Sequence, residues 1–189
     1  MIDDELVRYI DFSEKYLDGI LEIASARFGE NYITKDQIFD LAGNEMCSLA
    51  IGARDIDVLG YCLFYEENLD KASRDFKIPK EDMISVTGSD SYICHTKSMA
   101  LREGVEKRGL GYNLFKRTLD KAKHLGYKIA WCPAWKRGNY IPVEKILSKC
   151  EFDFFRIVPR LWEDDKSYKC VECGGPCRCD AAVYYKILN

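Results

Sequence analysis

The chain has 189 residues, a formal net charge of −3, 47% hydrophobic residues and 31% charged residues. At about 150 residues per domain, this length predicts one domain with its own core. The plentiful apolar residues exclude a mainly disordered chain, and no apolar run approaches the roughly 20 residues that span a bilayer. The acidic balance argues against a polyanion-binding protein. We therefore expect neither a nucleic-acid nor a membrane partner.

The start of the chain and its cysteines indicate a cytoplasmic protein. Residues 1–5 are mostly acidic and no apolar run follows them, so we expect no secretory signal there. The nine cysteines are an odd number, and without such a signal they indicate a reducing compartment. We expect free thiols or a bound metal.

The expected elements alternate between strands and helices, with Gly29 ending the first helix and Thr34 capping the second. In chain order they are a strand at residues 6–12, helices at 13–28 and 34–41, strands at 47–53 and 58–65, a polar excursion with room for a short helix at 69–88, a strand at 92–101, a helix at 111–125, a strand at 128–132, a helix at 142–149, and strands at 154–158 and 181–188. This order predicts a mixed α/β sheet and not a regular βαβ repeat.

The segment from Ser98 to Tyr112 carries the clearest functional signal. A strand runs into a loop with Gly109 and Gly111, and the loop opens directly into a helix. The first N–H groups of a helix have no intrahelical partner and favour an anion, and glycines let the backbone approach a phosphate closely. Between Arg102 and Lys128, eight basic residues face three acidic ones, which suits a polyphosphate ligand. A glycine turn before an amphipathic helix is the alternative.

Two familiar phosphate loops are excluded. A Walker A loop ends in Gly-Lys-Ser/Thr, whereas this loop ends in Gly109-Leu110-Gly111-Tyr112. The dinucleotide fingerprint requires a small residue where Leu114 stands.

The segment resembles motif A of the GNAT superfamily of N-acetyltransferases, Gln/Arg-x-x-Gly-x-Gly/Ala after a strand of the type Ser-Leu-Ala-Val. The stretch from Asn139 to Phe152 loosely resembles the second signature of that family. The resemblance implies the GNAT fold, a mixed and mostly antiparallel central sheet flanked by helices on both faces. It further implies a single domain over residues 1–189, with a Cys-rich insert at about 166–180 between the last two strands. Dimers are common in the family, so a homodimer is also an expectation.

The resemblance implies an acetyl-CoA-dependent N-acetyltransferase, in which a primary amine of a small molecule or a protein attacks the thioester directly. Loop amides would hold the pyrophosphate, the strand backbone would pair with the pantetheine, and an N–H near Leu101 would bind the acetyl carbonyl. The cofactor-binding residues implied in this way are Met99, Ala100, Leu101, Lys107, Arg108, Gly109, Leu110, Gly111, Tyr112 and Asn139.

Three positions depart from the family pattern, and Glu151, in place of a glycine of the second signature, is one of them. The first motif residue is Glu106, whose carboxylate would repel a phosphate if it faced the ligand. The tyrosine that often protonates the departing thiolate in the family is replaced by Leu147, and Tyr140 is the nearest replacement acid. The departures at Glu106 and Leu147 support the alternative function, a non-catalytic acyl-CoA-binding or zinc-stabilised sensor or interaction module on the same scaffold.

His95 is the candidate general base. Counted back from the loop, it matches the strand position of the catalytic glutamate in the histone-acetylating branch of the family. Imidazole titrates near neutrality and can take a proton from an ammonium group. A strand histidine satisfied by its neighbours is the alternative.

Four cysteines crowd into residues 170–179, as Cys170, Cys173, Cys177 and Cys179 around Gly174-Gly175-Pro176. Four thiolates can complete a tetrahedral zinc site, and a glycine-rich turn lets the chain fold around it. Free or reversibly oxidised thiols are an equal alternative, and an iron–sulfur cluster is a third. A metal here would be a structural zinc beside the acceptor and not a catalytic ion.

Overall fold

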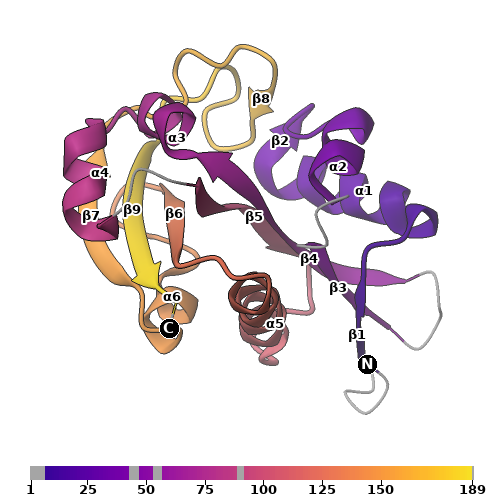
Figure 1. Cartoon of the computed structure of the whole chain (residues 1–189). Helices are drawn as coiled ribbons and strands as arrows, with labels where there is room; N and C mark the ends of the chain where they lie inside the picture. The colour runs from indigo at the N-terminus through magenta and orange to yellow at the C-terminus, as the bar shows by residue number, and fades with distance from the viewer. Residues whose placement is uncertain (1–6, 43–46, 53–56, 89–91, 189) are drawn as a thin grey trace.

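The structure, a computed structural model, describes residues 7–42, 47–52, 57–88 and 92–188 (Figure 1). The acidic start of the chain, residue 6 of the first expected strand and residue 53 of the second lie outside these ranges. No helix in the described residues is long and apolar enough to cross a membrane.

The nine strands of the described residues are β1 (Arg8–Asp11), β2 (Gly29–Glu30), β3 (Cys47–Ile51), β4 (Val58–Asn68), β5 (Tyr92–Leu101), β6 (Ile129–Lys136), β7 (Asp153–Val158), β8 (Lys169–Cys170) and β9 (Asp180–Ile187). The helices are the 3-10 turn η2 (Glu14–Tyr16) and α1 (Leu17–Phe28), α2 (Lys35–Ala42), α3 (Leu69–Phe76), α4 (Lys80–Thr87), α5 (Leu110–His124) and α6 (Glu144–Lys149).

Seven strands form one sheet in the order β1-β3-β4-β5-β6-β9-β7. Each neighbouring pair is antiparallel except β5 and β6, which run parallel. The two short strands β2 and β8 form a separate antiparallel pair. This confirms the expected mixed, mostly antiparallel sheet.

Helices cover both faces of the sheet (Figure 1). On one face, α5 and α6 pack on the sheet; Phe64 of β4, for example, meets Phe115 of α5 with ring centroids 5.1 Å apart. On the other face, α1 and α2 cover β3 and β4, and α3 and α4 cover β6, β9 and β7. Since both faces are buried, β4 reads as an almost continuous apolar run before its two glutamates.

The polar excursion at residues 69–88 is two helices, α3 and α4. In α3 the side chains of Leu69, Ala72 and Phe76 are buried, at the i, i+3, i+7 spacing of one helix face. The remaining residues of α3 are polar, which hid this period in the sequence. The β2–β8 pair was also not expected, because two-residue strands have no sequence period.

The start of α2 offers a test of its capping. The Gln37 backbone N–H donates to Thr34 Oγ1 (3.3 Å), and the Thr34 N–H donates to Gln37 Oε1 (2.9 Å). This reciprocal capping box satisfies two N–H groups that the helix leaves free. Thr34→Ala should cost about 1 kcal/mol and lower Tm by about 2–4 °C. Thr34→Ser keeps the hydroxyl and is the control; equal Tm values for the two variants in a thermal melt would contradict the assignment.

Candidate active site

The parallel strands β5 and β6 separate soon after they meet. Their register consists of two pairs, Cys94 with Ala130 and His95 with Trp131. β5 nevertheless continues to Leu101, and β6 continues to Lys136. The strands therefore form a V whose vertex lies at His95, and one edge of β5 beyond that vertex has no strand partner.

The β4–β5 pairing decides which backbone groups face this opening. The Arg102 N–H donates to Leu59 O (2.8 Å), and the register places Gly60 opposite Leu101 and Cys62 opposite Met99. Because hydrogen-bonded pairs alternate with non-bonded pairs in an antiparallel ladder, the N–H and C=O groups of Met99 and Leu101 point away from β4. They point into the V, where the family resemblance places the pantetheine. Ala100, between them, is buried in the core under α1 and α2.

A β-bulge lies in β5 next to the vertex. Leu63 pairs with Ser98 and Phe64 with Thr96, so Lys97 is an extra residue without a β4 partner. The Tyr32 hydroxyl donates to Lys97 O (3.2 Å), and the Lys97 Nζ lies 5.5 Å from the centroid of the Tyr32 ring. Tyr32 therefore covers the backbone of β5 from the side of α1.

The loop after β5 adopts left-handed backbone at Gly104, Lys107 and Gly109 (φ +84°, +66° and +79°). It leads into α5, whose N-cap is Gly109 and whose first turn has no side-chain cap. The Asn113 N–H donates to Gly109 O (3.0 Å), so the N–H groups of the three preceding residues lack an intrahelical acceptor. These residues are Leu110, which is buried, Gly111, and Tyr112, which is half-buried.

The two motif glycines have different physical roles. A Cβ at Gly109 would meet nothing within 4 Å, so glycine serves the left-handed turn there and the space above it is open. A Cβ at Gly111 would lie 3.0 Å from Ile146 Cδ1 of α6. Gly111 therefore lets α5 and α6 pack closely.

Glu106, the departure from the motif, is held inside the loop. Its carboxylate forms an ion pair with Arg27 of α1 and accepts a hydrogen bond from the Gly104 N–H (2.8 Å). The Arg27 Nε also donates to Leu101 O (2.8 Å). Partial burial acts to raise the pKa of Glu106, but backbone hydrogen bonds and Arg27 hold it below its ordinary value. Arg27 thus ties the end of β5 to the loop and neutralises the charge that would oppose a phosphate.

The basic excess of this region lies largely on α5 and is partly neutralised. Asp11 of β1 pairs with Arg117 and Lys121, and Asp120 pairs with Lys116. These pairs lie along the exposed side of α5 and not at its N-terminus. The local charge excess is therefore weaker support for a polyphosphate site than the free N–H groups are.

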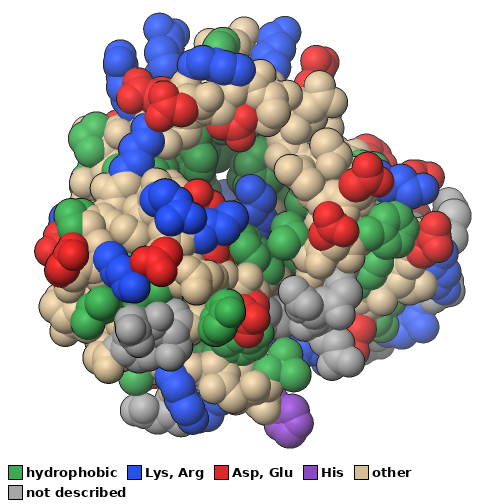
Figure 2. All heavy atoms as spheres, turned by 45° about the horizontal axis from the view of Figure 1, so that its top comes forward, with side chains coloured by type: hydrophobic (Ala, Val, Ile, Leu, Met, Phe, Trp, Pro, Cys, Tyr) green, Lys and Arg blue, Asp and Glu red, His purple; other side chains and the backbone are tan. Residues whose placement is uncertain are grey.

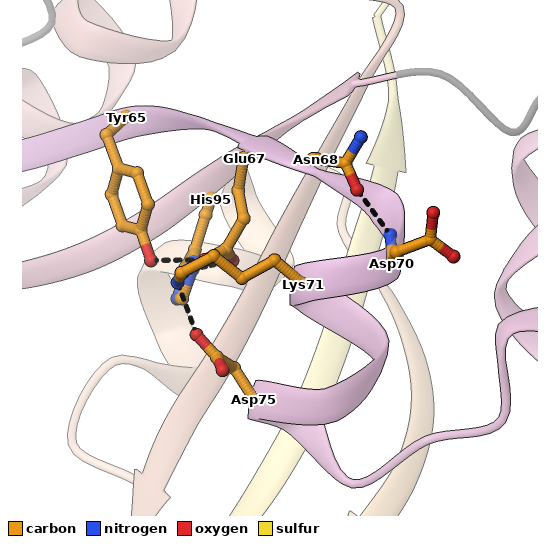
Figure 3. A network of polar contacts seen from close by, with 7 residues as sticks. All are labelled: Tyr65, Glu67, Asn68, Asp70, Lys71, Asp75 and His95. Atoms are coloured by element: carbon orange, nitrogen blue, oxygen red, sulfur yellow. Dashed lines mark hydrogen bonds and ion pairs between the residues drawn. The ribbon is translucent and has the colours of Figure 1, made fainter.

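His95 belongs to a buried polar network that joins β4, β5 and α3 (Figure 3). The Nδ1 of His95 lies 2.7 Å from Oε2 of Glu67, and both side chains are buried. The other oxygen of Glu67 accepts from the Tyr65 hydroxyl (2.9 Å) and from Lys71. Phe76 packs edge-on against the imidazole, with centroids 4.7 Å apart.

The network and its burial favour the neutral form of His95. Burial acts to raise the pKa of Glu67, but hydrogen bonds from His95 and Lys71 hold it well below its ordinary value. Burial lowers the pKa of His95, although Glu67 acts to raise it. A neutral His95 facing an ionised Glu67 donates its proton from Nδ1, so Nε2 carries the free lone pair. An imidazole in this state can accept a proton at Nε2.

The residues expected from the second signature lie on and after the turn between β6 and α6. Asn139 and Tyr140 are exposed, and Tyr140 is held by backbone hydrogen bonds with Arg137. Leu147 is fully buried in the core under α5. The position where the family often carries an acid is therefore a packing position in this chain.

The remaining predicted residues fall into two places. Lys107 and Arg108 are exposed in the loop before α5. The four clustered cysteines converge in the segment between β7 and β9, which contains β8. Figure 2 looks onto the face that carries this segment; the face is hollowed near its centre, and hydrophobic and Lys or Arg side chains line the hollow.

Glu67, Arg27 and Tyr32 were not among the predicted site residues. Glu66 and Glu67 lie near the end of the apolar strand β4. Two adjacent carboxylates at the end of a buried strand could have pointed to Glu67 from the sequence. Nothing in the sequence marks Arg27 or Tyr32, because their partners Leu101 and Lys97 are more than sixty residues away.

No protein-family profile matches this sequence, and no curated protein matches it. Solved structures of N-acetyltransferases do match its fold. The structure of arylalkylamine N-acetyltransferase 2 from Aedes aegypti gives a TM-score of 0.68 at 12% identity, over 97% of this chain and 99% of that one. NAA60 from Arabidopsis thaliana in complex with acetyl-CoA gives 0.67 at 10% identity, over 97% and 99%.

Ard1 from Thermoplasma volcanium gives a TM-score of 0.64 at 15% identity, over 97% of this chain and 99% of that one. Identities this low establish the fold alone. The chain has the fold of the GNAT N-acetyltransferases, as the resemblance of its loop implied.

Proposed function

We propose that this protein is an N-acetyltransferase that moves an acetyl group from acetyl-CoA to a primary amine in a ternary complex. The observation that carries the proposal is the continuous path from the V between β5 and β6, along the Met99 backbone and the Leu101 N–H that point away from β4, to the uncapped start of α5. The similar structures include one of an enzyme named for arylalkylamines and one in complex with acetyl-CoA. We also infer that the chain is a single acetyltransferase domain that works in the cytoplasm. The Cys-rich segment is an insert in this domain.

The residues present fit an acetyl-CoA ligand. The N–H groups of Leu110, Gly111 and Tyr112 would hold the pyrophosphate, with the open space at Gly109 giving access. The free edge of β5 would hold the pantetheine as a further strand. When bound, acetyl-CoA supplies an activated thioester carbonyl. The Leu101 N–H points into the V and would polarise that carbonyl.

His95 would act on the acceptor. An amine attacks only in its neutral form, and His95 Nε2 would take the proton from its ammonium group. Glu67 would hold the imidazole in the required tautomer, as a positioning residue. Tyr140 is the proposed acid for the departing thiolate, and Asn139, Lys107 and Arg108 are proposed ligand contacts around the loop. Bringing the amine and thioester together would supply much of the acceleration.

A charge change at Gly109 tests the cofactor site. Gly109→Asp places a carboxylate in the open space above the loop, where it would repel the pyrophosphate. Asparagine has nearly the same shape as aspartate and tolerates left-handed backbone equally well. Gly109→Asn is therefore the control, and its difference from Gly109→Asp measures the effect of the negative charge. Calorimetric titration with acetyl-CoA should show binding to the wild type, a modest loss for Gly109→Asn and at least a roughly tenfold further loss for Gly109→Asp, since one like-charge contact costs on the order of 1.4 kcal/mol.

Wild-type protein and acetyl-CoA would then be mixed with a panel of primary amines while the release of CoA is measured. Release above the thioester hydrolysis background supports a transferase. Binding without release from any amine would instead favour the non-catalytic acyl-CoA-binding module. Absence of acetyl-CoA binding by folded wild-type protein would overturn the proposal.

A further inference from the structure

Four cysteine sulfurs meet in the segment between β7 and β9. The Sγ atoms of Cys170, Cys173, Cys177 and Cys179 all lie within 4.8 Å of one another. Cys173 Sγ and Cys179 Sγ are 3.6 Å apart. In a tetrahedral thiolate site with Zn–S bonds of about 2.3 Å, the sulfurs lie about 3.8 Å apart. The spacing therefore leaves room for one ion at the centre of the four sulfurs.

The backbone is folded around this centre. The Cys170 N–H donates to Gly175 O (2.8 Å), and the Gly174 N–H donates to Cys170 O (2.9 Å). Gly174 has left-handed backbone (φ +67°), which glycine adopts without strain. The Arg178 N–H points at Cys173 Sγ (3.3 Å). An N–H directed at a sulfur stabilises a thiolate and orients a metal ligand.

These four cysteines differ from the other five. Within the described ranges, no other group of three or more Cys, His, Asp or Glu side chains has ligand spacing. Cys150, for example, is buried among apolar side chains under α5 and α6. Ordinary burial of small apolar residues explains Cys150, but it does not explain four sulfurs converging from ten consecutive residues.

We propose that Cys170, Cys173, Cys177 and Cys179 form a closed, structural Zn²⁺ site. An all-thiolate set of four selects zinc or an iron–sulfur cluster. A polynuclear cluster holds its thiolates farther apart, because several iron and sulfide atoms stand between them, so the spacing favours a single ion. Four protein ligands leave no open position for a substrate or water, so the ion has no catalytic role.

The site fastens the segment to the end of α1. Cys170 lies in β8, where it pairs with Gly29 of β2, and the Val171 N–H donates to Phe28 O (3.0 Å). Tyr168 packs edge-on against Tyr32, with centroids 5.5 Å apart. Tyr32 in turn contacts the β5 backbone at the bulge, as described above. The ion would thus hold one wall beside the V, and this inference about the metal does not depend on the proposed acetyl transfer.

The test measures metal in the full chain purified under reducing conditions. Elemental analysis should find one zinc per wild-type chain. Cys173→Ser and Cys177→Ser should each lose most of the metal. Cys150→Ser, which removes a buried thiol outside the site, should keep it. Equal zinc in Cys173→Ser and Cys150→Ser would overturn the proposal.

A second measurement covers the case in which a cluster variant fails to fold. Wild-type protein is stripped with a chelator, reduced, and titrated with Co²⁺, which gives intense visible absorption when four thiolates bind it tetrahedrally. Wild type and Cys150→Ser should show this spectrum. Cys173→Ser should bind Co²⁺ at least roughly tenfold more weakly, since even the loss of a residue that only hydrogen-bonds to a metal ligand lowers metal affinity about 10–100-fold. No zinc and no cobalt spectrum in reduced wild type, or iron with acid-labile sulfide, would overturn the proposal.

Discussion

His95→Ala is expected to lower kcat for amine acetylation by about 10²–10⁴-fold, the usual contribution of a general base. Acetyl-CoA affinity should be essentially unchanged, because His95 lies at the vertex of the V and not at the loop. The wild-type rate should rise with pH through the pKa of His95 and then level off, since the neutral imidazole is the active form. Burial lowers that pKa, so the rise should fall below the ordinary histidine value.

His124→Ala is the matched control for this prediction. His124 is the other histidine of the chain and lies exposed in the last turn of α5. Its removal should leave kcat and the pH profile in place. An acetylation rate and pH profile in His95→Ala equal to those of the wild type would remove His95 from the mechanism.

Glu67→Gln separates positioning from simple folding. The change keeps the shape of the side chain and removes the charge that faces His95, so kcat should fall about 10–100-fold. Because Glu67 acts to raise the pKa of His95, its loss should move the acidic limb of the rate profile to lower pH. Glu66→Gln, whose carboxylate contacts Tyr127 instead, should move neither quantity. A lower kcat with no shift in the acidic limb of the pH–rate profile would indicate a purely structural role for Glu67.

Gly29→Ala is expected to be the most destabilising of the conservative substitutions in this chain. Gly29 ends α1 with φ +128° and pairs with Cys170 across β2 and β8. A Cβ at this position would lie 1.8 Å from Lys169 O, a backbone atom that cannot turn away. The strained backbone and the forced separation of the strands together should cost about 2–4 kcal/mol, or roughly 5–15 °C in Tm.

Gly126→Ala separates the cost of backbone strain from the cost of the steric clash. Gly126 also has left-handed backbone (φ +91°), but a Cβ there would meet nothing within 4 Å. It should therefore lose only the conformational term of about 1 kcal/mol. Thermal melts of the two variants measure the clash as their difference. Similar Tm values would show that β2 and β8 are not held together as described.

Because the β2–β8 pair borders the cysteine cluster, Gly29→Ala also bears on the metal. Separation of the strands should move Cys170 relative to the other three thiolates and weaken zinc retention. Gly126→Ala, at the end of α5, should retain zinc like the wild type. The two variants thus connect the stability of this small sheet with the proposed metal site.

Some features of the site are local in the chain, and others depend on distant residues. Gly109 and the strand before it were recognisable because a strand, a left-handed turn and a helix start are local features of consecutive residues. Gly111 also has a packing role that the local sequence did not indicate, because its neighbour Ile146 is distant in the chain. The Glu106 carboxylate was expected to repel a phosphate if it faced the ligand. In the folded loop it instead pairs with Arg27 of α1.

The sequence by itself determined the apolar periods, the capping and turn residues, the glycine loop before α5, the spacing of the four cysteines and, through these, the fold class. These depend on neighbours within about one helical turn or one strand, where the chain's own geometry limits the choices. Only the tertiary structure decided that β5 and β6 separate after His95, that Glu67 faces the imidazole, and that the four sulfurs share one centre. Each of these brings together groups from elements packed against one another, and their distances follow from burial and strand pairing across the whole sheet.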